Sequence, residues 1–128
     1  MGKRGLQIVC GILAVIPVVT GLIGLLGTSD PLYAGVPANV LLDTNLRFFA
    51  GVWLVLGLAL LWIVPRIDRE TALFRVLWAM VFAGGIGRLV SMLVLAVPPA
   101  PFIAFTVLEL VGAPLIVWWH SRLAVAKA

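Results

Sequence analysis

The sequence predicts an all-α integral membrane protein, an antiparallel up-down bundle of four transmembrane helices. Of its 128 residues, 63% are hydrophobic and only 11% are charged, and the mean hydropathy is +1.21. One crossing needs about 20 apolar residues, so the chain has material for four crossings and little else. We therefore expect a single membrane domain over residues 1–128, with no room for an extramembrane catalytic module.

The first apolar run covers residues 5–27 and follows two basic residues. It exceeds the roughly 7 to 15 apolar residues of a signal-peptide core, so we expect a retained transmembrane helix. Pro17 lies in its middle and removes one backbone donor, which predicts a bend. Three small residues spaced four apart predict a ridge for close helix packing. These residues are Thr20, Gly24 and Thr28.

The second helix is predicted over residues 43–64, after a long loop rich in turn-forming residues. Its start is assigned to residues 43–45, Asp-Thr-Asn, because these residue types accept hydrogen bonds from the unpaired N–H groups at helix N-termini. A short charged turn follows at residues 65–70. Thr71 is the expected cap of the next helix for the same reason.

The third helix is predicted over residues 72–95 and the fourth over residues 102–120. Between them, the proline-rich segment Pro98–Pro101 is expected to break the chain. Pro114 lies inside the fourth helix and cannot donate a backbone hydrogen bond. We therefore expect the helical hydrogen bonding to loosen near Leu110.

The Lys and Arg residues near the helix ends predict how the protein is oriented in the membrane. With four crossings they all lie on one side, whereas the first and third loops carry no Lys or Arg. The positive-inside rule places that side, with both termini, in the cytoplasm. Anionic lipid headgroups, rather than nucleic acid, are the expected counterions. The residues are Lys3, Arg4, Arg66, Arg69, Arg75, Arg122 and Lys127.

An arginine and a glutamate lie deep within the apolar runs. An unpaired arginine at mid-membrane costs about 2.5 to 3.5 kcal/mol on insertion scales, so Arg88 requires a partner. At 1.5 Å per residue, Arg88 and Glu109 both lie about 10 Å below the outer boundary, which predicts that they pair. Small or polar residues at helical spacing predict that both charges face other helices. They are Gly84, Gly85 and Ser91 beside Arg88, and Thr106, Gly112 and Ala113 beside Glu109, where the larger Phe105 joins them.

Arg47 lies about 6 Å below the same boundary and either reaches outward or joins this pair. If it joins, two arginines and one glutamate need a second anion, either Asp43 one helical turn away or a bound anionic group. Burial favours the neutral form of Glu109, and nearby arginines favour the charged form. The predicted binding residues are Asp43, Asn45, Arg47, Arg88, Ser91 and Glu109.

Three short motifs carry a resemblance to a known family. They are Asp43-x-Asn45-x-Arg47-Phe48-x-x-Gly51, Gly84-Gly85-x-Gly87-Arg88 and Glu109-Leu110. Together they resemble an uncharacterised bacterial family of small four-helix membrane proteins, domain of unknown function 4345, and the likeness covers most of the chain. The resemblance implies a multi-pass protein of the bacterial inner membrane and supplies no activity.

The favoured function is a non-enzymatic bundle, either structural and accessory or ligand-binding. Its expected partners are the lipid bilayer, a second copy or a larger membrane complex, and a small polar or anionic ligand, but no nucleic acid. A purely structural reading is that Arg88 and Glu109 only hold the helices in register. The alternative function is a small proton- or ion-coupled transporter. Small multidrug resistance transporters, however, use an acidic residue in the first helix, and this one has none.

An enzyme is disfavoured. Cys10 is the only cysteine, and the sequence offers no metal-ligand cluster and no nucleophile beside a base. We therefore expect no catalytic residue, no metal and no cofactor. His120, the only histidine, is expected at the membrane interface and cannot supply bis-histidine haem ligation.

Overall fold

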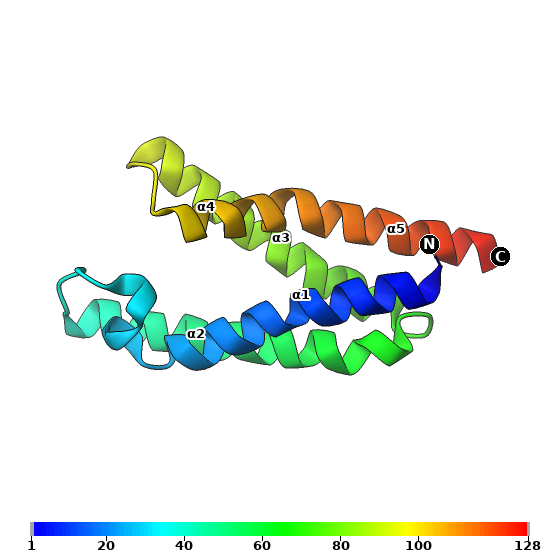
Figure 1. The fold of residues 1–128 in the computed structure, drawn as a ribbon, viewed down its shortest axis with the longest axis horizontal. Helices are drawn as coiled ribbons and strands as arrows, with labels where there is room; N and C mark the ends of the chain where they lie inside the picture. The colour runs from blue at the N-terminus through cyan, green and yellow to red at the C-terminus, as the bar shows by residue number, and fades with distance from the viewer. Residues whose placement is uncertain (1, 128) are drawn as a thin grey trace. The chain divides into compact units, whose positions relative to one another are not determined.

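The computed structural model describes residues 2–127, with side chains described as far as residue 124, and these residues form helices and no strand. Four helical segments are long and apolar enough to cross a membrane (Figure 1). They are Lys3–Gly24, Val40–Arg66, Thr71–Val94 and Ala100–Ala124. The chain divides into two compact units, one comprising Gln7–Pro65 and the other the remaining residues. The side chain of Lys127 lies outside those described.

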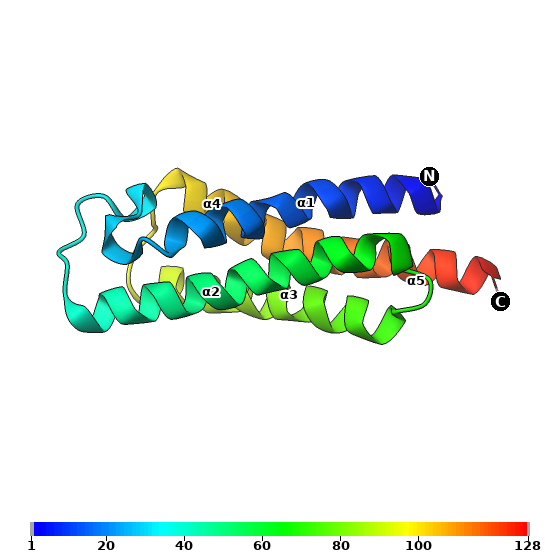
Figure 2. The same cartoon turned by 90° about the horizontal axis from the view of Figure 1, so that it is seen from below.

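In the unit Gln7–Pro65, helices α1 (Lys3–Gly24) and α2 (Val40–Ile63) lie side by side (Figures 1 and 2). Gln7 Nε2 donates to the carbonyl of Val64 at 2.9 Å, near the start of α1 and the end of α2. Trp53 Nε1, in the middle of α2, donates at 2.9 Å to Oγ1 of Thr20, in the last turns of α1. From Gln7 to Thr20 the contacts advance along α1, while their partners go back along the chain from Val64 to Trp53, so these two helices run in opposite directions.

Glycines allow α1 and α2 to approach closely. A Cβ atom on Gly21 would lie 2.8 Å from the Cα of Leu54, and one on Gly24 would lie 2.8 Å from the Cβ of Ala50. Gly57 is equally tight against the backbone nitrogen of Val18, at 2.8 Å. Thr20 and Gly24 therefore belong to a close-packing ridge, as predicted. The third predicted member, Thr28, lies beyond the end of α1, which stops at Gly24 instead of residue 27.

Helix α2 begins earlier than the sequence indicated. Asn39 has extended backbone angles and its side chain accepts a hydrogen bond from the Leu42 N–H at 2.8 Å, so Asn39 is the N-cap and Val40 the first helical residue. The predicted start at residues 43–45 is wrong. Asp43 instead occupies the first turn of the helix, where its carboxylate is available to other partners.

The other unit contains α3 (Thr71–Val94), α4 (Ala100–Val107) and α5 (Ala113–Lys127). Glu70 precedes α3 and makes no side-chain cap hydrogen bond, so the prediction of Thr71 as the cap is wrong and Thr71 is the first helical residue. Helix α4 begins at Ala100 with Pro101 inside its first turn. Proline is tolerated there because first-turn N–H groups have no partner within the helix.

A wide π-helical turn, Leu108–Gly112, joins α4 to α5. Pro114 follows it directly and has no N–H to donate to the carbonyl of Leu110, four residues earlier. Hydrogen bonds in a π-turn span five residues instead of four, which accommodates the missing donor. The predicted loosening near Leu110 is therefore observed, and it places Glu109 inside the irregular turn.

The core of this unit lies where α3 packs against α5. Phe74 is fully buried, and its ring stacks on His120 with centroids 4.2 Å apart. The Nε2 atom of His120 lies 2.8 Å from the carbonyl oxygen of Ile67, in the turn before α3. His120 is therefore a core residue of the unit, only 3% exposed. Its depth in a membrane stays a prediction.

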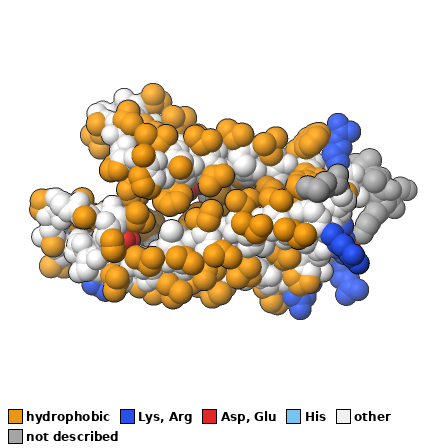
Figure 3. All heavy atoms as spheres, in the orientation of Figure 1, with side chains coloured by type: hydrophobic (Ala, Val, Ile, Leu, Met, Phe, Trp, Pro, Cys, Tyr) orange, Lys and Arg blue, Asp and Glu red, His pale blue; other side chains and the backbone are white. Residues whose placement is uncertain are grey.

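Large hydrophobic side chains remain exposed on all the long helices. Examples are Ile12 on α1, Val55 on α2, Leu93 on α3 and Leu115 on α5. Figure 3 shows hydrophobic side chains over most of the face in view. In water such a surface would be strongly unfavourable, whereas lipid tails cover it at no cost.

Candidate functional site

Arg88 of α3 and Glu109 of the π-turn lie in contact. The Nε atom of Arg88 donates to both carboxylate oxygens of Glu109, to Oε1 at 3.2 Å and to Oε2 at 3.0 Å. The glutamate side chain is 7% exposed, whereas that of the arginine is 36% exposed. The glutamate side chain is thus enclosed by protein, whereas the arginine side chain is partly exposed.

One glycine of the Gly84-Gly85-Ile86-Gly87 segment makes this contact possible. A Cβ atom on Gly85 would lie 2.8 Å from the Cβ of Glu109, closer than real Cβ atoms approach. Gly84 and Gly87 are different, because a Cβ atom on either would meet nothing within 4 Å. Gly85 therefore brings α3 and the π-turn together, and Gly84 and Gly87 border open space.

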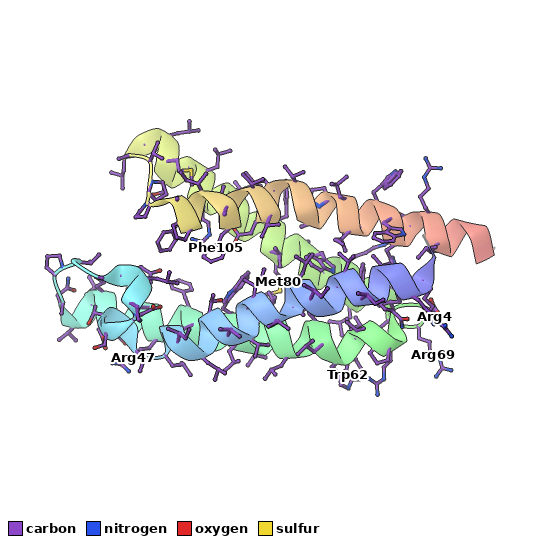
Figure 4. The ribbon with its side chains drawn as sticks, in the orientation of Figure 1. Arg4, Arg47, Trp62, Arg69, Met80 and Phe105 are labelled. Atoms are coloured by element: carbon purple, nitrogen blue, oxygen red, sulfur yellow. The ribbon has the colours of Figure 1, made fainter. Side chains whose placement is uncertain are left out.

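Two aromatic rings of α4 flank the guanidinium. The central carbon of Arg88, Cζ, lies 5.8 Å from the ring centroid of Phe102 and 5.9 Å from that of Phe105, which is labelled in Figure 4. The two rings are perpendicular, with centroids 6.2 Å apart. Each cation–π contact contributes roughly 0.5 to 2 kcal/mol, depending on how well water is excluded.

The two terminal amino groups of Arg88 have no hydrogen-bond partner among the described residues. Its side-chain hydrogen bonds all run from Nε to Glu109, and neither Nη1 nor Nη2 donates to any residue that the structure describes. A guanidinium carries five N–H groups in a planar fork, so four of them remain for another molecule. The site can therefore donate several charge-assisted hydrogen bonds at a partly exposed position.

Arg47 is placed differently. Its Nε donates to Asp43 Oδ2 at 2.7 Å, its Nη2 to Asp43 Oδ1 at 3.4 Å and its Nη1 to the carbonyl of Leu25 at 2.6 Å. Figure 4 shows Arg47 projecting from α2 beside the turn that follows α1. All three guanidinium nitrogens thus have partners within the unit Gln7–Pro65. Of the two anions considered for Arg47, Asp43 is the one in contact.

Asp43 also holds the turn after α1. Its Oδ1 accepts hydrogen bonds from the backbone N–H of Thr28 at 2.9 Å and from the Thr28 hydroxyl at 3.1 Å. Gly27 has a left-handed φ of 63°, and a Cβ atom there would lie only 2.1 Å from Asp43 Oδ1. Asp43 and Arg47 therefore fasten the loop to α2, which is a structural task.

The structure brings the predicted binding residues together as two pairs, Asp43 with Arg47 and Arg88 with Glu109, one in each unit. Asn45 and Ser91 are exposed. The inclusion of all six residues in one site stays a prediction. Sequence reasoning missed Phe102; the available signal was its spacing of three from Phe105, which puts both rings on one side of a helix.

Among the residues described, no three His, Cys, Asp or Glu side chains gather where a metal ion could be held. A family model described as Domain of unknown function (DUF4345) matches residues 5–120 of the chain. No curated protein and no solved structure matches it.

Proposed function

The chain belongs to the family described as Domain of unknown function (DUF4345), a description that gives no activity, so we propose its function from the contacts of Arg88 and Glu109. It is a small, non-enzymatic integral membrane protein of the bacterial inner membrane that binds a polar or amphipathic ligand through Arg88. Its four helices cross the bilayer as an antiparallel up-down bundle, and both termini lie in the cytoplasm.

Charge and surface support the membrane part of this proposal. The exposed apolar side chains suit a lipid environment. Most of the basic residues lie near the N-terminus, near the turn between α2 and α3, or near the C-terminus, three places that share one side of the membrane if the chain crosses it four times. The Nζ of Lys3 also contacts the carboxylate of Asp68, which pairs the start of α1 with the turn between α2 and α3. The proposal requires these two segments to lie on the same side of the membrane.

Reporter fusions test this topology. A cytoplasmic reporter at residue 128 should be active, and the same reporter inserted within residues 33–39 should be inactive, because the loop is proposed to face outward. A periplasmic reporter should give the opposite pair of results. Equal activity at the two positions would contradict the orientation and the depth assigned to Arg88.

The observation that carries the ligand-binding part is the unused end of Arg88. Arg47 shows how a purely structural arginine is satisfied in this chain, since each of its guanidinium nitrogens has a partner. Arg88 engages Glu109 through Nε alone and leaves Nη1 and Nη2 without a described partner. Charged groups in a membrane are costly unless paired, so a molecule that accepts from these groups would be bound favourably.

A thermal-shift screen of the purified protein tests this function. Lipids, quinones and polar metabolites would be added to the full chain in a neutral detergent, and the melting temperature recorded. At least one compound should raise it in the parent protein and fail to do so in Arg88→Gln. Arg75→Gln is the matched control, because Arg75 is an exposed arginine of the same helix. If every stabilising compound acted equally on both variants, Arg88 would not be a ligand site.

A proton-coupled transporter is the second candidate, and the position of Glu109 favours it. A buried carboxylate inside a membrane-spanning segment is a typical element of proton pathways, and π-turns occur frequently at functional sites. Proteoliposomes with an imposed pH gradient would then show proton flux that Glu109→Gln abolishes. Flux equal to that of empty liposomes would remove this candidate.

A further inference from the structure

We propose that the Arg88 site binds an uncharged amphipathic molecule through a carbonyl oxygen, with the apolar part of that molecule lying along α3 beside Gly84. This inference rests on the proposed function and names the class of ligand. Two sources share the chemistry, the ester carbonyls of a lipid and the ring carbonyls of a quinone.

Charge balance favours a neutral ligand. Arg88 and Glu109 form a salt bridge, and with both groups ionised the pair has no net charge; the Glu109 side chain is almost fully enclosed. A bound anion would leave a net negative charge next to Glu109, in surroundings where charge is costly. A carbonyl oxygen adds no charge and still accepts charge-assisted hydrogen bonds from the guanidinium.

The donor geometry suits an oxygen acceptor. Nη1 and Nη2 offer N–H groups but no acceptor, so the ligand must supply lone pairs and need not donate. The perpendicular rings of Phe102 and Phe105 contact the guanidinium and present apolar surface next to those donors. A molecule that joins an oxygen acceptor to an apolar body matches both features.

Gly84 provides room for that body. It lies four residues before Arg88 and thus on the same face of α3. A Cβ atom there would meet nothing within 4 Å, unlike one on Gly85, which packs against Glu109. A larger residue at position 84 would therefore extend from this open position into the space where the ligand is proposed to lie. Gly87 also borders open space but lies on a different face, which makes it the matched control.

The test uses probes that differ mainly in the head group. Binding of methyl dodecanoate, dodecanoate, dodecyl methyl ether and a decyl-substituted benzoquinone to the full chain would be measured by calorimetry and thermal shift in a maltoside detergent. The ester or the quinone should bind more tightly than the anion and the ether. Whichever of the two binds more tightly identifies the lipid or the quinone as the source.

The variants locate the site. Arg88→Lys keeps a charge beside Glu109 but loses the planar fork, and it should weaken carbonyl binding roughly ten- to a hundredfold, as expected for losing one or two charge-assisted hydrogen bonds. Gly84→Leu should weaken binding without lowering the ligand-free melting temperature, and Gly87→Leu should leave binding unchanged. Because Gly84→Leu keeps the Arg88–Glu109 pair, it remains informative if Arg88→Lys folds poorly.

Several results would overturn the inference. Tighter Arg88-dependent binding of dodecanoate than of the ester and the quinone would show that the site takes anions, while leaving the proposed ligand-binding function intact. Equal binding of the ether would show that the carbonyl is not recognised. Absence of binding by all four probes, or equal effects of Gly84→Leu and Gly87→Leu, would reject the ligand class and its location. The broader screen alone decides the proposed function.

Discussion

Replacing Gly85 by alanine should destabilise the protein, whereas the same change at Gly84 should not. The new methyl group at position 85 would lie 2.8 Å from the Cβ of Glu109 and 3.1 Å from side-chain carbons of Leu110. A Cβ atom is fixed to the backbone, so α3 and the π-turn would have to separate. Overpacking of this kind costs about 1 to 3 kcal/mol.

Comparison of the two variants isolates that packing cost. Alanine is favoured over glycine inside a helix by about 0.8 to 1 kcal/mol, and this gain applies equally at both positions because both lie within α3. At Gly84 the new Cβ meets nothing within 4 Å, so no opposing term arises there. Gly85→Ala should therefore be less stable than Gly84→Ala by about 1 to 3 kcal/mol.

Unfolding in mixed detergent micelles, followed by far-ultraviolet circular dichroism, would measure this difference. Gly87→Ala serves as a second open position and should behave like Gly84→Ala. If Gly85→Ala were as stable as the other two variants, α3 and the π-turn would not approach as closely as described. The contact between Arg88 and Glu109 would then lose its geometric basis.

Three further substitutions test the two ion pairs. Glu109→Gln should lower the melting temperature and reduce the free energy of unfolding by about 1 to 3 kcal/mol. The loss is smaller than for a fully buried pair because the Arg88 side chain is 36% exposed. An unchanged melting temperature would mean that the pair contributes no stability. Gly27→Ala should cost at least about 1 to 2 kcal/mol from the left-handed backbone, and more than Gly35→Ala, because only position 27 adds a clash with Asp43. Asp43→Asn should increase protease cleavage in the loop after α1, since the bonds to Thr28 weaken; cleavage at the parent rate would remove the fastening role.

Which segments of this chain form helices is determined by interactions between residues that are close together in the sequence. About 20 apolar residues span a bilayer, and four such runs separated by polar or proline-rich segments indicate four spanning helices before any packing is known. The effect of Pro114 is equally local, because a missing N–H disturbs the carbonyl four residues earlier in any helix. Both features depend only on residues close together in the chain.

Helix boundaries were less predictable, because several residues can serve as caps. Asn39 and Asp43 both have side chains that accept hydrogen bonds from a helix N-terminus. Asp43 is instead bound to Thr28 and Arg47, two partners supplied by the turn after α1 and by α2 itself. The position of that turn therefore decides that Asn39, and not Asp43, caps the helix.

The site shows the same division between local pattern and tertiary contact. Local spacing placed Arg88 and Glu109 at one depth, but it did not distinguish Gly85, which packs on Glu109, from Gly84, which borders open space. Nor did it show that every guanidinium nitrogen of Arg47 has a partner, whereas Nη1 and Nη2 of Arg88 have none among the described residues. The sequence by itself determined which segments are helical and which charges are costly in lipid. Tertiary structure decided how those charges are satisfied, because that depends on the close approach of segments far apart in the chain.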